Sequence, residues 1–195
     1  EPNAFVEDIK LCLARDGLWV IEMHYLPTVL QRNAWDSICQ EHLELYSLTS
    51  LKHLLDRHGL EIIEVDLNDI NGGSFRVYVK NTLRYYKRGV NGDFPSSNQN
   101  TKNVDELLRL ERKLGLTTPV PYREFADRIK ESCSRIRAYL EKLKDEGKAV
   151  SAYGASTKAN TFLQYAKIDS TLICSIAERS KEKFGKKTVG TNIPI

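Results

Sequence analysis

The stretch from residue 122 to residue 146 constrains the fold more than any other feature, because its apolar residues recur at helical spacing without a break. A helix with such a stripe buries it against a sheet or another helix. Gly147 then supplies the residue that most readily ends a helix. The residues of the stripe are Phe125, Ile129, Ile136, Leu140 and Leu143.

The segments after Gly147 predict a β-α-β unit. Gly154 would then lie at the carboxyl end of the first strand, where open α/β sheets bind ligands. The expected elements are a strand at 149–153, a turn at 154–157, a helix at 158–166 and a strand at 171–176.

The first 80 residues predict a separate α/β region. Its first strand, Leu18–Met23, is an apolar run typical of buried parallel strands. The loop Asn71-Gly72-Gly73 is expected to join two later strands as an antiparallel pair. The expected elements are a helix at 4–14, the strand at 18–23, helices near 34–41 and 49–59, and strands at 60–67 and 74–80.

Residues 81–103 lack any sustained period and contain Gly89, Gly92 and Pro95, so a linker is expected there. The predicted domains are therefore residues 1–80 and 104–195, the second being a helical segment followed by the β-α-β start. A helical pattern already under way at Phe5 and an end at Ile195 without a closing helix suggest a truncated chain.

Charge and cysteine usage limit the partners that are expected. The chain has 29 Lys and Arg against 26 Asp and Glu, and the net charge of +3 looks spread along the sequence, so nucleic acid is not an expected partner. No apolar run is long enough for a membrane span, and no targeting segment is visible. Four cysteines without a C-x-x-C pair predict no metal site and a reducing, cytoplasmic location.

Glu41 and His42 place a carboxylate beside an imidazole, with Tyr25 and Tyr46 near in sequence. Imidazole titrates near neutrality and can accept a proton from a carbon that a neighbouring carbonyl has acidified. A single Glu-His dipeptide in a loop is usually a solvated surface pair, so the residues alone favour that interpretation over catalysis.

Two glycine turns are further candidates. The turn Gly154-Ala155-Ser156-Thr157-Lys158 opens a helix whose amino end suits a phosphate, although neither a Walker motif nor a complete G-x-G-x-x-G is present. A plain strand-to-helix turn explains it as well. Gly72 and Gly73 form either a hairpin loop or a place where a substrate approaches the backbone closely.

As an ordered set, these segments resemble the S-adenosylmethionine-dependent C-methyltransferases that act on nucleotide-linked keto sugars, in their carboxy-terminal part. Members of that family have an amino-terminal zinc module, a central Rossmann-like methyl-donor domain and a Rossmann-like carboxy-terminal domain. The segments that carry the resemblance are Gly17–Glu22, Tyr25-Leu26, Glu41-His42, Tyr46-Ser47, Gly59–Glu61, Asn71–Arg76, Tyr153–Lys158 and Gly190–Pro194.

The resemblance implies that His42 removes a proton beside the sugar ketone, with support from Glu41, before the resulting enolate attacks the sulfonium methyl group. It implies that the methyl-donor site and the zinc cysteines lie upstream, so the chain alone is expected to be inactive. Some members carry Tyr where this chain has Cys39. The residues implied to bind substrate are Tyr25, Tyr46, Gly72, Gly73, Gly154, Ala155, Ser156 and Lys158.

Two other functions remain open. A nicotinamide-dependent oxidoreductase would use the β-α-β unit at Gly154, and Glu178 stands roughly where an acidic ribose ligand belongs, but the glycine fingerprint is incomplete. A non-catalytic interaction module would use the helix at 122–146 and would need a wider apolar stripe than the sequence shows.

Overall fold

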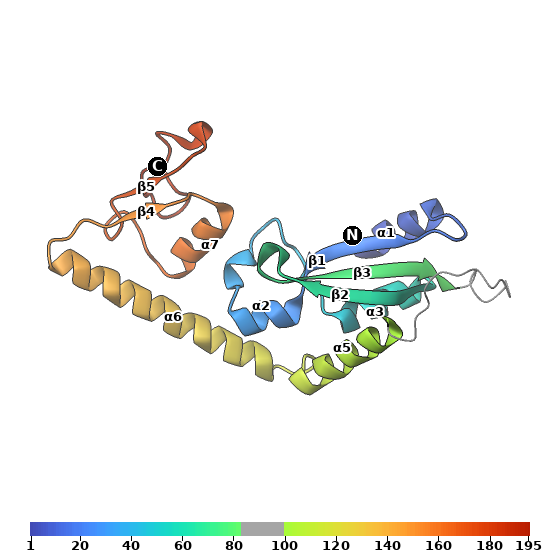
Figure 1. The fold of residues 1–195 in the computed structure, drawn as a ribbon. Coiled ribbons are helices and arrows are strands. Elements are labelled where there is room, and N and C mark those ends of the chain that lie inside the picture. Colours follow the sequence, from blue (N-terminus) through green and yellow to red (C-terminus); the bar gives the residue numbers. More distant parts are fainter. Residues whose placement is uncertain (83–99) are drawn as a thin grey trace. The chain divides into compact units, whose positions relative to one another are not determined.

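A computed structural model describes residues 1–82 and 100–195 of the chain (Figure 1). The described residues divide into two compact units. Unit 1 comprises Glu1–Arg32 and Glu44–Pro121, and unit 2 comprises Asn33–Leu43 and Tyr122–Ile195. The mixture of helices and small sheets confirms the α/β class at this general level.

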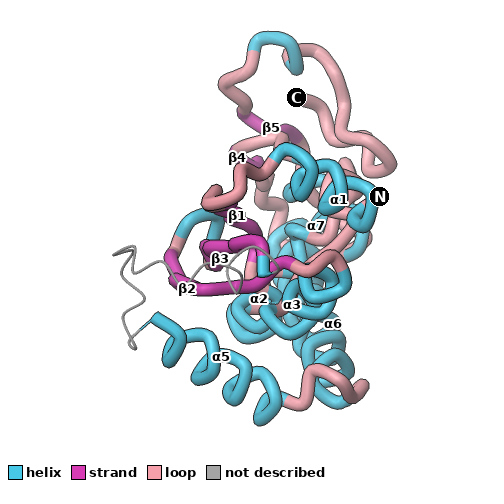
Figure 2. Tube along the Cα trace, turned by 90° about the vertical axis from the view of Figure 1, so that its right-hand side faces the viewer, coloured by secondary structure: helices cyan, strands magenta, loops and turns pink. Residues whose placement is uncertain are grey.

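Unit 1 contains a three-stranded sheet in the order β1-β3-β2 (Figure 2). Its strands are β1 (Trp19–His24), β2 (Leu60–Asn68) and β3 (Ser74–Asn81). The predicted antiparallel pair is confirmed, because β2 pairs with β3 from Leu60 opposite Asn81 to Asn68 opposite Ser74. The turn between them is a short 3₁₀ segment at Ile70–Gly72.

The expectation of a buried parallel strand at Leu18–Met23 is wrong. β1 pairs with β3 in antiparallel fashion. Its exposure alternates along the strand, with Val20 and Glu22 facing solvent. Although most residues of the run are apolar, they alternate between the covered and the exposed face of the sheet, which is typical of a sheet covered on one face only. Since β1 and β2 both run against β3, they run parallel to each other.

Helices cover the apolar face of this sheet. Phe75, Val77 and Val79 of β3 are fully buried, whereas the alternate residues Arg76 and Tyr78 are partly exposed. Helices α3 and α5 both contact β2 and each other. The helices of unit 1 are α1 (Pro2–Cys12), α2 (Leu26–Arg32), α3 (Leu48–Arg57) and α5 (Asn100–Leu114).

The amino end of α3 is held by two sets of hydrogen bonds. Ser47 is its N-cap and forms a reciprocal capping box with Ser50, two residues before the expected start of the helix at residue 49. The carboxylate of Glu111, from α5, accepts hydrogen bonds from the backbone N–H groups of Leu48 at 2.6 Å and Thr49 at 2.8 Å. Glu111 is only 1% exposed, so it docks α5 on α3 through a buried, fully partnered carboxylate.

The helix predicted near 34–41 is also wrong. The helix lies earlier, at α2, where Pro27 stands in the first turn and Asn33 adopts a left-handed φ of 56° just after the end. Residues 34–41 instead contain one 3₁₀ turn, Trp35–Ser37, followed by a loop.

Unit 2 confirms the predicted β-α-β order. Its elements are β4 (Ser151–Tyr153), α7 (Thr157–Tyr165) and β5 (Ser175–Ala177), and β4 pairs with β5 in parallel. The second strand begins later than expected because residues 170–173 form a turn, in which Leu172 and Ile173 donate to the carbonyl of Asp169. The carboxy-terminal segment continues this structure, since the N–H of Ile176 donates to the Pro194 carbonyl at 2.8 Å.

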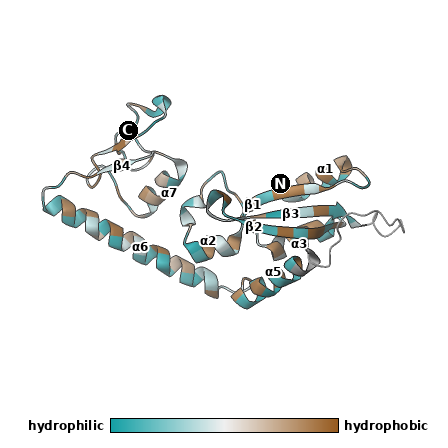
Figure 3. Cartoon of the chain, viewed as in Figure 1, coloured by the Kyte–Doolittle hydropathy of each residue, from teal (hydrophilic) through white to brown (hydrophobic). Residues whose placement is uncertain are grey.

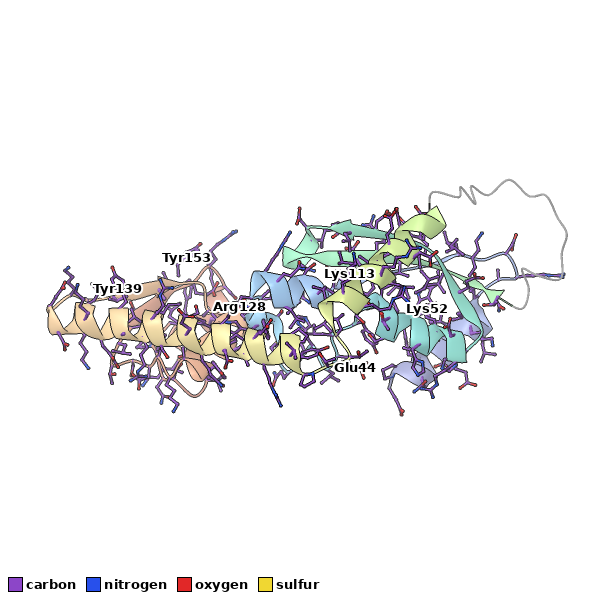
Figure 4. All side chains as sticks on the ribbon, turned by 90° about the horizontal axis from the view of Figure 1, so that it is seen from below. Glu44, Lys52, Lys113, Arg128, Tyr139 and Tyr153 are labelled. Atoms are coloured by element: carbon purple, nitrogen blue, oxygen red, sulfur yellow. The ribbon has the colours of Figure 1, made fainter. Side chains whose placement is uncertain are left out.

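The long amphipathic helix is α6 (Val120–Asp145), which belongs to unit 2 from Tyr122 onward. Apolar and polar residues alternate along its length in Figure 3. Its buried residues are Phe125, Ile129, Cys133 and Leu140. The predicted stripe is therefore confirmed at Phe125, Ile129 and Leu140, but it is wrong at Ile136, which is exposed. Tyr139, labelled in Figure 4, is exposed on the same helix.

The predicted linker at 81–103 falls mainly on residues 83–99, which lie outside the described residues, so it stays a prediction. Two segments are grouped differently from the expected domain ranges. Helix α5 belongs to unit 1, where it packs on β2, and residues 33–43 belong to unit 2.

Candidate active site

The loop 33–43, which carries Glu41 and His42, is anchored in unit 2 by Trp35. The Trp35 ring is buried and contacts the rings of Phe162 at 5.6 Å and Tyr165 at 5.1 Å, both on α7. Aromatic packing of this kind fixes both position and orientation. The Trp35 contact therefore packs the loop that carries the predicted base against α7, the helix that follows the turn at Gly154.

The ring of His42 is oriented by a backbone carbonyl. Its Nδ1 atom lies 2.7 Å from the carbonyl oxygen of Ser37, a buried residue whose own hydroxyl donates to the Ala34 carbonyl. A carbonyl can only accept, so Nδ1 carries the proton of this hydrogen bond. In the neutral ring the basic lone pair is then on Nε2.

Glu41 is held by a different set of partners. Its Oε1 atom accepts a hydrogen bond of 3.1 Å from the Thr157 hydroxyl, in the first turn of α7. The pKa of Glu41 is lowered, first by a hydrogen bond from the Cys39 thiol and to a smaller extent by Thr157 and the nearby His42. Glu41 is thus kept ionised, and its contact with Thr157 joins the loop to the turn at Gly154–Lys158.

The turn at Gly154–Lys158 is stabilised by hydrogen bonds to side chains of unit 2. Gly154 has a φ of 92°, and the Ser156 side chain caps α7 by accepting from the N–H of Ala159 at 3.1 Å. The carboxylate of Glu178 accepts from the N–H of Ala155 at 2.7 Å, and the Lys183 ammonium donates to the Ala155 carbonyl at 2.7 Å. Both sides of Ala155 are therefore held by charged side chains.

Glu178 also accepts from the N–H groups of Ser180 and Arg179. These hydrogen bonds, with that of Ala155 and the nearby Lys183, lower its pKa to about 2. A phosphate therefore cannot use the N–H of Ala155 without displacing an ionised carboxylate. The same contact argues against the oxidoreductase interpretation, because here Glu178 bonds the turn instead of facing outward for a ribose.

The two tyrosines of the predicted substrate site lie in unit 1. Tyr25 is 1% exposed and packs on Phe75 with ring centroids 5.1 Å apart. Burial, followed by the charge of Glu111, raises the pKa of Tyr25, yet its hydroxyl has no partner in hydrogen-bonding geometry among the described residues. Tyr46 is partly exposed, and its hydroxyl donates to Glu44. The structure therefore favours a packing role for Tyr25.

The paired glycines, Gly72 and Gly73, lie next to Tyr25 and α2 in unit 1. The Gly73 carbonyl accepts from the N–H of Tyr25 at 3.2 Å, and a Cβ on Gly73 would lie 2.2 Å from Thr28 Cγ2. Gly72 is exposed, and its carbonyl accepts from Arg32 at 2.8 Å. Gly73 therefore serves a close approach of backbone to α2, which accounts for the glycine without a substrate.

The structure thus places the predicted site residues in two sets. Glu41, His42 and the turn 154–158 come together in unit 2, and Tyr25, Tyr46, Gly72 and Gly73 come together in unit 1. Sequence reasoning missed Ser37, Trp35, Thr157 and Lys183 as parts of the site. The roles of Trp35, Thr157 and Lys183 depend on contacts between segments far apart in sequence. Ser37 lies only five residues from His42, but its role depends on the conformation of the loop, which the sequence does not show.

The described residues also bear on whether the chain has a membrane-spanning helix, a metal site or a ligand pocket. No described helix is both long and apolar enough to cross a bilayer. No group of three potential metal ligands occurs in the part of the chain that the structure describes. A pocket of unit 1 between β2 and α5, lined by Val65, Leu67, Leu107 and Leu110 among others, includes none of the predicted site residues.

The fold and site of unit 2 define a small α/β unit in which the Nδ1 atom of a histidine contacts a backbone carbonyl and the neighbouring Glu41 contacts a strand-to-helix turn. The chain belongs to the C-methyltransferase family, because it matches the C-methyltransferase C-terminal domain over residues 69–195. It is also 32% identical over 187 residues to the C-methyltransferase NovU of Streptomyces niveus. That match covers 96% of this chain and 42% of the length of the relative.

Proposed function

We propose that this chain forms the carboxy-terminal part of an S-adenosylmethionine-dependent C-methyltransferase acting on a nucleotide-linked keto sugar, with His42 as the base. The observation that carries the proposal is the hydrogen bond of 2.7 Å between His42 Nδ1 and the Ser37 carbonyl, which leaves the lone pair of the neutral ring on Nε2. Family membership supplies the reaction class.

The proposed chemistry of the chain's own residues is a proton transfer. Nε2 of neutral His42 takes a proton from the carbon beside the ketone, and the C–H electron pair forms a carbon–carbon double bond as the carbonyl pair moves to oxygen. The ionised Glu41, held by Thr157 and Cys39, stabilises the imidazolium that results. The proton then leaves to solvent from Nε2.

The methyl group would come from the sulfonium of S-adenosylmethionine, and the glycine turns of the described residues do not fit that donor. Gly73 backs directly onto Thr28, and the N–H of Ala155 is taken by Glu178. We therefore propose that the donor site lies outside the described residues. Calorimetry should show no saturable binding of S-adenosylmethionine by the chain, and micromolar binding would contradict this placement.

The Rossmann-like character of both units is part of the proposal. In unit 1, two strands of the same direction are joined through α3, with an antiparallel strand between them. In unit 2, a parallel pair is joined through α7. Both arrangements are compatible with doubly wound sheets that carry an antiparallel strand.

The direct test of the function uses the upstream-extended protein with a labelled methyl donor and a panel of nucleotide-linked keto sugars. Mass spectrometry should find a labelled methyl group on a carbon adjacent to the ketone. Labelling on oxygen or nitrogen, or labelling of substrates without a ketone, would contradict the proposal.

A further inference from the structure

The charge of the chain is concentrated in one short segment, contrary to the even spread expected above. Five basic and two acidic residues lie between Glu178 and Lys187, which gives this segment a net charge of +3. The whole chain also has a net charge of +3, so the remaining residues are neutral in sum. The basic residues are Arg179, Lys181, Lys183, Lys186 and Lys187.

Four of these five cations have no acidic partner within the described part of the chain. Arg179, Lys181, Lys186 and Lys187 are exposed and form no ion pair with any residue the structure describes. Lys183 lies 3.7 Å from Glu178. On α6, by comparison, Arg137 is paired with Glu141 at 2.9 Å. The basic segment therefore has a surplus of positive charge that the described protein does not neutralise.

The segment is fixed at both ends. At its start, Glu178 and Lys183 bind the two sides of Ala155. At its end, the N–H of Ile195 donates to the Lys186 carbonyl at 2.9 Å, and Lys187 forms an antiparallel bridge with Pro194. A backbone held in this way lowers the entropy that binding a ligand would cost.

The segment is also connected to the proposed base within unit 2. Lys183 bonds Ala155, Ala155 lies two residues before Thr157, and Thr157 bonds Glu41. The cations therefore belong to the same compact unit as His42. A substrate that carries both an acidic C–H bond and phosphates needs a base and positive charge in one unit.

We propose that the segment Arg179–Lys187 binds the diphosphate of the nucleotide-linked substrate, an inference that rests on the proposed function and replaces the N–H of Ala155 as the phosphate contact. Lysine ammonium groups bind phosphate as point charges. A nucleic acid is less favoured, because nucleic-acid-binding domains are strongly basic and the rest of this chain is neutral in sum.

The test measures binding of inorganic pyrophosphate to the 195-residue chain by calorimetry at low salt. Lys186→Gln with Lys187→Gln removes two charges from the segment, and Lys142→Gln with Lys144→Gln removes two exposed charges from α6. Both double variants have the same net charge. We expect the first to weaken binding about tenfold or more and the second to leave it within about twofold.

Equal weakening in both double variants, or no saturable binding by the unchanged chain, would overturn the proposal. Tighter binding of a single-stranded oligonucleotide or of phosphatidylserine vesicles than of pyrophosphate would also overturn it, because the ligand would then be a macromolecular surface.

Kinetics of the upstream-extended protein separate this proposal from the proposed function. Lys186→Gln with Lys187→Gln should raise KM for the nucleotide sugar about tenfold with little change in kcat. An unchanged KM with intact methyl transfer would overturn the diphosphate site and leave the function standing. Pyrophosphate binding that depends on the segment, without methyl transfer to any keto sugar, would support the anion site and contradict the function.

Discussion

The Nδ1 atom of His42 lies 2.7 Å from the carbonyl oxygen of Ser37, and this contact determines which nitrogen can act as a base. The Ser37 residue is buried, and its carbonyl also accepts from the N–H of Cys39 at 3.1 Å. The acceptor is therefore a fixed part of the loop, and the ring is held in position before any substrate binds.

This contact predicts the tautomer of the neutral ring. Nitrogen-15 NMR of the chain, at a pH where the His42 ring is neutral, should show a protonated Nδ1 and an unprotonated Nε2. His53, exposed on α3, provides a reference signal in the same spectra. A neutral His42 protonated on Nε2 would contradict the assigned role of Ser37.

The second prediction concerns the ionisation of Glu41. Thr157→Val removes one hydrogen bond to the carboxylate, so the pKa of Glu41 should rise toward its ordinary value. Cys39→Ala should raise it further, because the thiol is the larger cause of the lowering. A carbon-13 titration of the Glu41 carboxyl measures both shifts. If the Cys39 variant shifted the pKa less than the Thr157 variant, the thiol contact would be weaker than the structure indicates.

The third prediction is a pH dependence that arises from Glu178. Its pKa is lowered from 4.5 to about 2, so the stability it provides is fully present above about pH 4.5 and is lost as pH falls toward 2. Glu178→Gln should lower Tm near neutral pH, and the difference from the unchanged chain should shrink as pH falls through that window. Glu182, which accepts no hydrogen bond from a described residue, is the control: Glu182→Gln should not reproduce this trend.

The fourth prediction concerns the buried carboxylate of Glu111. Glu111→Ala leaves the N–H groups of Leu48 and Thr49 without their acceptor and should lower the free energy of unfolding by about 2 to 4 kcal/mol. Glu106→Ala, an exposed position on the same helix, should change it by less than about 0.5 kcal/mol. Urea unfolding of the two variants distinguishes them. Similar losses in both would mean that helix propensity, and not the cap, explains the effect.

Much of the fold followed from local pattern. The order of β4, α7 and β5 and the β2–β3 pair were predicted, because helix and strand periods can be read from consecutive residues. The stripe of α6 was predicted in part, since Ile136 is exposed and Cys133 is buried. The direction of β1 was not, because a short apolar run does not show whether its neighbour runs parallel or antiparallel. The loop at 34–41 was mistaken for a helix, although Pro27 marked the start of an earlier one.

The site was harder to predict than the fold. Glu41 and His42 were singled out because they are adjacent, whereas Thr157 lies 116 residues from Glu41. The sequence indicates a ribose ligand as the only role for Glu178, because nothing local shows that it bonds Ala155, 23 residues away. The surplus of charge between Glu178 and Lys187 lies in consecutive residues, but the net charge of the whole chain does not show where it is concentrated.

The most direct measurement of the central claim is the exchange of the proton beside the ketone with solvent deuterium, catalysed by the upstream-extended protein. His42→Ala should slow this exchange and lower kcat for methyl transfer in parallel, each by about 10²- to 10⁴-fold, while nucleotide-sugar binding stays within a few-fold. His53→Ala, in the exposed helix position, should change neither rate. If His42→Ala exchanged the proton at the unchanged rate, His42 would not be the base, and the role assigned to its Nε2 atom would be wrong.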